Sequence, residues 1–211
     1  MKLATKVLVG AFVVAGGALL GRWQAARRFV EEPRYTVVRT LGDSIELRRY
    51  EPMVVAETRV RASFDAASNE GFRRLAAYIF GGNQRRESLA MTAPVAVESE
   101  RLAMTAPVAV ESESGEQIVR FVMPPGRASS TLPMPDDARV TLREVPAQTV
   151  AVLTYSGTTT PAILETRTQA LRDALAREGL TTTGNAVSSR YDPPSTLPML
   201  RRNEIWIPIA D

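Results

Sequence analysis

The 211-residue sequence contains no cysteine and no histidine. No disulfide can form, and a catalytic serine has no histidine to activate it. Zinc sites built from histidine and cysteine are excluded, as is an iron ion held by a histidine. The strong metal ligands that remain are carboxylates, with tyrosine and methionine as alternative ligands for iron.

Net positive charge is confined to the N-terminal segment. Five of the 26 basic residues precede Glu31, whereas none of the 23 acidic residues does. Residues 31–211 therefore contain 21 basic and 23 acidic residues, a net charge of −2. A nucleic-acid-binding domain has its positive charge on the domain itself, so this chain is predicted not to bind nucleic acid.

The longest uncharged run, residues 7–21, lies between basic residues near the N-terminus. As a helix it would be about 22 Å long, against a hydrocarbon core of about 30 Å. Residues 3–23 would span a membrane if Lys6 reaches the interface. An uncleaved anchor, a cleaved signal peptide and a buried soluble helix all remain open. We therefore expect an N-terminal membrane anchor or signal segment, residues 1–30, followed by one domain, residues 31–211.

The domain alternates short β-rich runs with two amphipathic segments. Strands are predicted at residues 34–41, 44–50, 52–60, 117–124, 139–145, 149–157 and 203–209. A first helix is predicted at residues 63–80, with Ser63 as its N-cap, and Gly81-Gly82 ends it. A second helix is predicted from Thr160-Pro161 to Gly179.

A weak internal echo predicts the architecture. Residues 47–60 and 142–157 each contain Leu-Arg, a nearby proline and Val-Ala in a strand, and each precedes a helix. This predicts an α+β fold of two βαββ halves related by a pseudo-two-fold axis. Both helices then cover one face of an antiparallel sheet, and a groove where the halves meet is a natural ligand site.

A second repeat is exact: LAMTAPVAVESE occurs at residues 89–100 and 102–113, separated by Arg101. The period of thirteen is odd, so in one strand the copies would face opposite sides of a sheet. We therefore predict a meander in which residues 108–110 pair with 118–123. One copy belongs to the core sheet, and the other forms an added hairpin arm or loop.

Five motifs of the domain together resemble the SOUL haem-binding family, in a bacterial member. They are GFRRLAAYIFGGN (71–83), LAMTAPV (89–95 and 102–108), FVMP (121–124), TLPMPDDARVTLREVP (131–146) and RYDPPSTLPMLRRNEIWI (190–207). The resemblance implies a fold similar to bacterial effector-binding domains. It also implies non-enzymatic binding of haem or another tetrapyrrole in an apolar groove beside the first helix, for carriage or buffering.

The resemblance transfers only in part. Some family members bind haem through a histidine, and that mode cannot apply to this chain because it has no histidine. Members that hold haem by apolar contact, with basic side chains at the propionates, are a compatible model. The helix positions that supply those basic groups fall near Glu70 and Tyr78, neither of which is basic.

A porphyrin needs an apolar wall and one or two cations at its rim. We predict that the first helix and the repeats supply the cofactor-binding residues, which are Phe72, Arg73, Arg74, Leu75, Ile79, Met91 and Met104. The alternative is that the apolar residues are core and the arginines a solvated face. The two methionines either contact or ligate haem iron, or simply pack.

Other side chains also have two readings. Tyr78 and Tyr191 are phenolate ligands for iron or buried aromatics with hydrogen-bonded hydroxyls. Arg201 and Arg202 meet a carboxylate ligand or form an internal ion pair with Glu204 or Asp192.

Three other functions remain open. The domain could be a binding module for another amphipathic small molecule, an enzyme using Glu and Tyr for acid–base work, or an envelope scaffold without a small ligand. If the N-terminal segment is an anchor, we expect the protein at the bacterial inner membrane, with the domain in the periplasm as one arrangement.

Overall fold

The computed structural model describes residues 31–84, 100–113 and 115–211. The chain divides into two units, residues 1–31 and residues 32–211, and the second unit is described here. The predicted apolar segment, residues 7–21, lies outside the described residues. Among the residues that are described, no helix is long and apolar enough to cross a membrane.

The second unit is built on one antiparallel sheet of nine strands. In chain order the strands are β1 (Tyr35–Leu41), β2 (Ile45–Tyr50), β3 (Met53–Val60), β5 (Val108–Glu113), β6 (Glu116–Val122), β8 (Val140–Val145), β9 (Gln148–Tyr155), β10 (Val187–Arg190) and β11 (Asn203–Pro208). The helices are α2 (Phe64–Ile79) and α3 (Pro161–Arg177), with short 3₁₀ turns at Ser129–Thr131 and Pro198–Leu200. A separate two-stranded ribbon joins β4 (Asn83–Gln84) to β7 (Met134–Pro135).

The strand order confirms the two predicted βαββ halves. The sheet runs β1-β2-β9-β11-β10-β5-β6-β3-β8, so β3-α2-β5-β6 and β9-α3-β10-β11 meet at the central β10–β5 pair. The echoed segments 47–60 and 142–157 form β2–β3 and β8–β9, at matching places in the two halves. The leading strands are exchanged: β2 pairs with β9, and β8 pairs with β3.

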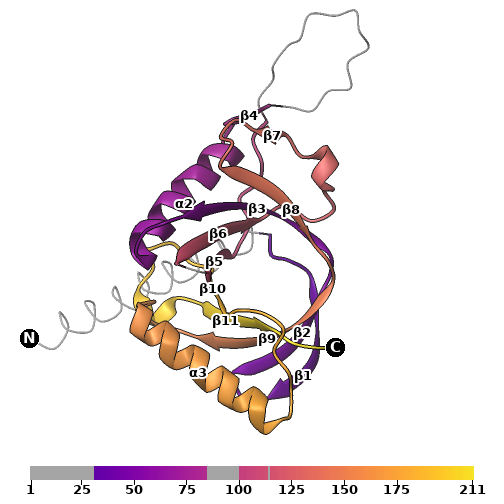
Figure 1. Cartoon of the computed structure of the whole chain (residues 1–211), viewed down its shortest axis with the longest axis vertical. Helices are drawn as coiled ribbons and strands as arrows, with labels where there is room; N and C mark the ends of the chain where they lie inside the picture. Colours follow the sequence, from indigo (N-terminus) through magenta and orange to yellow (C-terminus); the bar gives the residue numbers. More distant parts are fainter. Residues whose placement is uncertain (1–30, 85–99, 114) are drawn as a thin grey trace, which may run out of the picture. The chain divides into compact units, whose positions relative to one another are not determined.

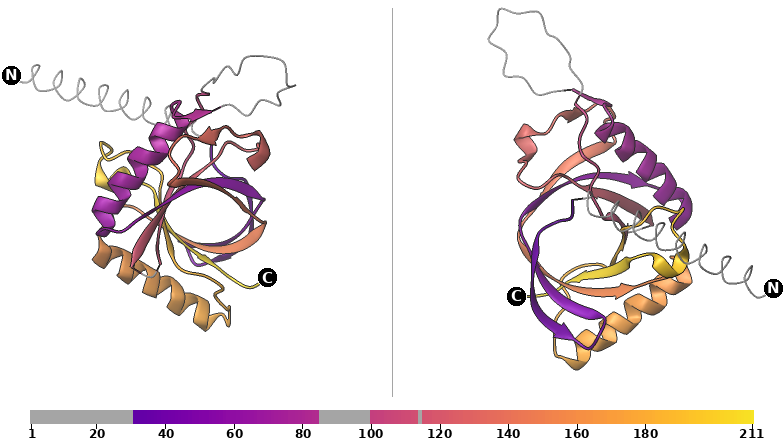
Figure 2. Two further views of the ribbon diagram at one scale, coloured as in Figure 1. Left: turned by 45° about the horizontal axis from the view of Figure 1, so that its top comes forward. Right: turned by 180° about the vertical axis from the view of Figure 1, so that it is seen from behind.

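The sheet curls, and both helices lie on the outside of the curl (Figures 1 and 2). Each helix covers its own half and forms its own core cluster. Leu75, Ile79 and Val119 belong to the cluster under α2, while Leu171 and Ile205 belong to the one under α3. The inner face of the sheet carries a third, aromatic cluster around Tyr50 and Trp206.

The helix α2 packs so closely on β6 that only glycine fits at residue 71. A Cβ added there would lie 2.5 Å from Cγ2 of Val119, inside any normal contact distance. The predicted helix end is confirmed, because Gly81 follows α2 with a φ of 116°. The predicted N-cap is wrong in one respect, since the Ser63 side chain makes no capping hydrogen bond.

The helix α3 begins and ends as its sequence predicts. The Thr160 side chain accepts a hydrogen bond from the backbone N–H of Ile163, and Pro161 occupies the first turn. Gly179 follows the helix with a φ of 68°, which favours glycine.

The second copy of the exact repeat belongs to the core sheet. Its strand β5 pairs with β6, placing Val108 opposite Phe121 and Val110 opposite Val119, so this part of the prediction is confirmed. The first copy lies outside the described residues apart from its last residue, Glu100. The Asn83 side chain bonds the backbone of Glu100 in both directions, at 2.7 and 2.9 Å.

Candidate functional site

A groove of about 490 Å³ lies between the two helices, where the two halves of the sheet meet. We call it the interhelix groove. The residues that line it are Phe64, Val110, Ser112, Gln117, Pro161, Leu164, Glu165, Thr168, Arg172, Asn185, Ala186, Ser188 and Ile205. A groove at the meeting point of the halves is what the internal duplication predicts.

The floor of the interhelix groove is apolar with one polar exception. Val110, Ser188 and Ile205 are cross-strand neighbours on β5, β10 and β11, so their side chains point to the same face. Phe64 of α2 and Leu164 of α3 add apolar walls. The Ser188 hydroxyl is buried and has no hydrogen-bond partner among the residues that the structure describes. The groove thus combines apolar surface with an unsatisfied polar atom.

Arg190 lies two residues beyond Ser188 on the same face of β10. It pairs in register with Val108 on one side and Asn203 on the other. Its guanidinium group lies 5.8 Å from the centre of the Phe64 ring, which lines the groove. Arg190 is partly buried, and burial lowers the pKa of its guanidinium despite the attraction of Asp65.

The predicted binding residues of α2 do not share one surface. Leu75 and Ile79 are buried beneath the helix, at 0% and 1% exposure, and so contact the core rather than a surface ligand. Phe72 is 40% exposed and packs edge-on against Phe121. Arg74 is largely covered and bonds Glu70 at 2.9 Å.

Arg73 also pairs with Glu70, at 2.7 Å, but its side chain remains exposed. Met104 is 44% exposed, and Met91 lies outside the described residues. Phe72, Arg73 and Met104 are therefore the described members of the predicted set that a surface ligand could reach most readily.

Neither candidate tyrosine has a spare hydroxyl. Tyr78 donates to the carbonyl oxygen of Pro133 at 2.9 Å, and Tyr191 donates to Glu204 at 2.7 Å. These contacts favour the packing interpretation of both tyrosines over iron ligation. In the described part of the chain, no group of three or more acidic side chains is placed to hold a metal ion.

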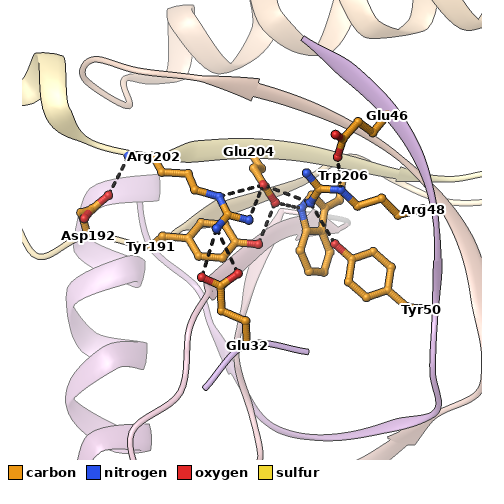
Figure 3. Close-up of polar contacts among 9 residues, drawn as sticks. All are labelled: Glu32, Glu46, Arg48, Tyr50, Tyr191, Asp192, Arg202, Glu204 and Trp206. Carbon is orange, nitrogen blue, oxygen red and sulfur yellow. Dashed lines mark hydrogen bonds and ion pairs between the residues drawn. The ribbon is translucent and has the colours of Figure 1, made fainter. Parts of the chain in front are cut away.

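A buried polar network surrounds Glu204 on the inner face of the sheet (Figure 3). Glu204 has no exposed surface, and its carboxylate accepts hydrogen bonds from Arg48 at 3.1 Å and Arg202 at 2.9 Å. The Tyr191 hydroxyl and the Trp206 indole N–H also donate to it, at 2.7 and 2.6 Å. Every hydrogen-bonding direction of this carboxylate is thus used within the protein.

The structure distinguishes between the two interpretations of Arg201 and Arg202. Arg202 forms the internal ion pair with Glu204, and its backbone N–H donates to Asp192 at 2.6 Å. Arg201 instead holds the preceding loop, donating to the carbonyl oxygens of Thr196 and Pro194. The internal ion-pair alternative therefore describes Arg202, whereas the Arg201 side chain is held by backbone carbonyl oxygens.

Electrostatics set the charge state of the network. Burial alone would raise the pKa of Glu204, but the Arg202 and Arg48 guanidinium groups and two hydrogen bonds lower it below its ordinary value. Burial also raises the pKa of Tyr191 well above its ordinary value. The carboxylate is therefore ionised and the phenol neutral at pH 7, as a structural ion-pair network requires.

Sequence reasoning missed Ser188 and Arg190, because the strand β10 is only four residues long. The available signal was the alternation within VSSR, which places Ser188 and Arg190 on one face and Ser189 on the other. Pairing β10 with the centre of the sheet, which the sequence does not reveal, turns that face toward the interhelix groove.

Comparisons with known proteins agree with this fold. The chain is 28% identical over 167 residues to Heme-binding protein 1 of Xenopus tropicalis, covering 78% of this chain and 83% of that protein. It is 27% identical over 188 residues to Heme-binding protein 2 of Homo sapiens, covering 87% and 88%. The crystal structure of the EcmrR C-terminal domain superposes with a TM-score of 0.53 at 12% identity, over 81% of this chain and 99% of that one.

The structural likeness supports the fold alone, which is the predicted effector-binding-like arrangement of a curled antiparallel sheet and two helices. The family model described as SOUL heme-binding protein matches residues 30–208, which is nearly the whole of the described unit. The chain therefore belongs to the SOUL haem-binding protein family.

Proposed function

We propose that this protein binds haem or a related tetrapyrrole without catalysing a reaction, and so carries or buffers it. The observation that carries the proposal is the family membership, which extends over residues 30–208. The curated relatives named Heme-binding protein 1 and 2 cover most of the same chain and support it.

The interhelix groove is the site that we propose for this function. A porphyrin is a flat apolar plate with two carboxylates on one edge. The groove has an apolar floor, Arg172 among its lining residues, and the Arg190 guanidinium group 5.8 Å from the ring of its Phe64 wall. The residues fit the plate and its carboxylates better than its iron, because the sequence offers no histidine or cysteine. We therefore expect weak to moderate affinity that depends on apolar contact.

Titration of the full chain in detergent with haemin tests the proposal. A saturable change in the Soret absorption at micromolar haemin supports it. If the folded protein gives a spectrum equal to that of free haemin in detergent, the proposal is contradicted.

Two matched substitutions locate the site. Phe64→Ala removes a ring from the wall of the interhelix groove, whereas Phe72→Ala removes an exposed ring from the outer surface of α2. Loss of affinity in the first variant alone places the porphyrin in the groove. Loss in the second alone favours the surface that includes Arg73 and Met104, as the sequence predicts.

A second candidate is a binding module for another amphipathic carboxylic acid in the same groove. The lack of a histidine or cysteine for iron favours it, since nothing in the sequence restricts the groove to a metalloporphyrin. Competition between haemin and a long-chain fatty acid separates the candidates. Displacement at matched concentrations indicates a general carboxylate site, and retention of haemin indicates a tetrapyrrole site.

We also propose that residues 7–21 attach the protein to a membrane, with the bacterial inner membrane and a periplasmic domain as the expected arrangement. The support is the uncharged run itself, bounded by basic residues. Recovery of the full chain in the membrane fraction after carbonate extraction is the expected result. Release into the soluble fraction contradicts the anchor.

A further inference from the structure

Arg190 is the exception among the covered arginines of the sheet. Arg48, Arg120 and Arg202 each form an ion pair with at least one carboxylate, at 2.5 to 3.1 Å. Arg190 forms no ion pair and no side-chain hydrogen bond with any residue in the described ranges. Its guanidinium group makes a cation–π contact with the Phe64 ring, 5.8 Å from the ring centre.

An unpaired guanidinium group in such a position costs folding free energy, because burial removes water that no protein acceptor replaces. Asp65, in the first turn of α2, attracts Arg190 from outside ion-pairing distance and offsets part of that cost. The neighbouring Asn203 side chain makes its hydrogen bonds elsewhere, donating to the carbonyl oxygen of Gly157 and accepting from the Thr159 hydroxyl. The arrangement leaves the donors of Arg190 available to a ligand.

Ser188, two residues before Arg190 on the same strand, also has an unpaired hydrogen-bond donor among the described residues. The residue is 6% exposed, and its hydroxyl is buried. Both side chains lie on the helix-facing side of β10, and both adjoin the interhelix groove through its floor or through Phe64. Two unsatisfied donors on one strand face call for an acceptor that is absent from the protein.

We infer that Arg190, assisted by the Ser188 hydroxyl, binds the carboxylate of the ligand that occupies the interhelix groove. The inference deepens the proposed function and rests on it: the ligand is an amphipathic carboxylic acid, and a tetrapyrrole propionate has the required chemistry. A guanidinium group presents paired N–H donors that match the two oxygens of a carboxylate. The apolar body of the ligand then lies over Val110 and Ile205.

Esterification provides a direct test, because it removes the ligand's charge and leaves its apolar body. Protoporphyrin IX and its dimethyl ester are titrated against the full chain in the same detergent, by fluorescence. We expect Arg190→Gln to weaken binding of the free acid about tenfold or more and to leave binding of the ester unchanged. The control is Arg177→Gln, which removes the same charge from an exposed arginine in the last turn of α3. It should leave the binding of both the free acid and the ester unchanged.

The outcomes separate the inference from the proposed function. If the wild-type chain binds neither porphyrin, the proposed function fails and the inference loses its ligand. If wild type binds the acid and Arg190→Gln binds it equally well, the inference alone is overturned. Equal weakening of acid and ester also overturns it, since Arg190 would then only shape the groove.

A stability measurement distinguishes a binding residue from a structural one. Arg190→Met removes the unpaired charge and keeps apolar contact with Phe64, so it should raise the Tm of the ligand-free protein. The same variant should lose the rise in Tm that protoporphyrin IX produces in wild type. A lower ligand-free Tm together with an intact ligand-induced rise contradicts the inference.

Discussion

Arg48 and Glu204 face each other across strand β9, with Nη1 of the arginine 3.1 Å from Oε1 of the glutamate, although 156 residues separate them in sequence. Both side chains are buried, at 4% and 0% exposure. The pair joins β2, the second strand of the chain, to β11, the last. It therefore couples the two ends of the domain in one polar network.

Removing the carboxylate from this network should be costly. Glu204→Gln leaves the buried Arg48 and the partly buried Arg202 without their shared counter-ion, and we expect a loss of about 3–5 kcal/mol in the free energy of unfolding. Urea denaturation followed by circular dichroism measures it. Glu178→Gln, which breaks an exposed ion pair with Arg39, is the control and should cost less than about 1 kcal/mol. Equal effects of the two changes would contradict the structural role of the network.

Acid should destabilise the domain through two carboxylates whose pKa is lowered in the folded state. Glu204 is held low by Arg202 and Arg48 against the effect of burial, and Glu57 by Arg120 and Arg143 in the same way. Below about pH 4.3, the usual glutamate pKa, these carboxylates bind protons in the unfolded chain but stay ionised in the folded chain. Stability is therefore present in full above that pH and is lost as pH falls through the lower, folded-state pKa values.

The measurement is urea denaturation at a series of pH values from 7 to 3. Glu57→Gln should be less stable than wild type at pH 7 and should lose less stability on acidification, because the variant has one fewer group that protonates. The same slope in wild type and variant would show that Glu57 does not contribute to acid unfolding.

The close approach of α2 to β6 predicts the effect of a single methyl group. Gly71→Ala improves helix propensity by about 1 kcal/mol but forces its Cβ against Val119, and we expect a net loss of about 1–3 kcal/mol. The double variant Gly71→Ala with Val119→Ala makes room for the methyl group. Its loss of stability should therefore be smaller than the sum of the losses in the two single variants, as thermal unfolding can establish. Strict additivity would show that the contact is not the cause.

Deleting residues 89–101 should leave a folded domain. The deletion removes one full period of the repeat, so the intact second copy still supplies β5 and its pairing with β6 and β10. It also brings Glu87 to the place of Glu100, two residues before Leu102, which keeps the local sequence pattern. A single cooperative transition in urea is the expected result. Loss of cooperative unfolding would show that the first copy is structural as well.

The sequence predicts most elements of the fold, because hydrophobic periodicity and helix-ending glycines are local signals. The helix α2 differs from its predicted range by one residue at each end. The echo between residues 47–60 and 142–157 also reveals the two halves. The sequence does not reveal which strands pair in the sheet. Neither the exchange of β2 and β8 nor the central β10–β5 pairing follows from local patterns.

The same limitation explains the candidate site. Leu75 and Phe72 are both apolar residues of one helix, and only the packed structure separates the buried side chain from the exposed one. Strand alternation places Ser188 and Arg190 on one face of β10, but no local pattern shows that their side chains lack partners. They are candidates because their polar atoms have no hydrogen-bond or ion-pair partner among the described residues. That property becomes visible only when the neighbouring side chains have been located in the folded structure.

The exchange of leading strands has a consequence for how the domain can be divided. Because β2 completes the sheet beside β9 and β8 completes it beside β3, each half lends the other an edge. A fragment comprising either half alone would expose unpaired backbone along that edge, and co-expressed fragments should reassemble. In this respect the domain resembles a strand-exchanged dimer joined end to end, whose smallest autonomous folding unit is the whole.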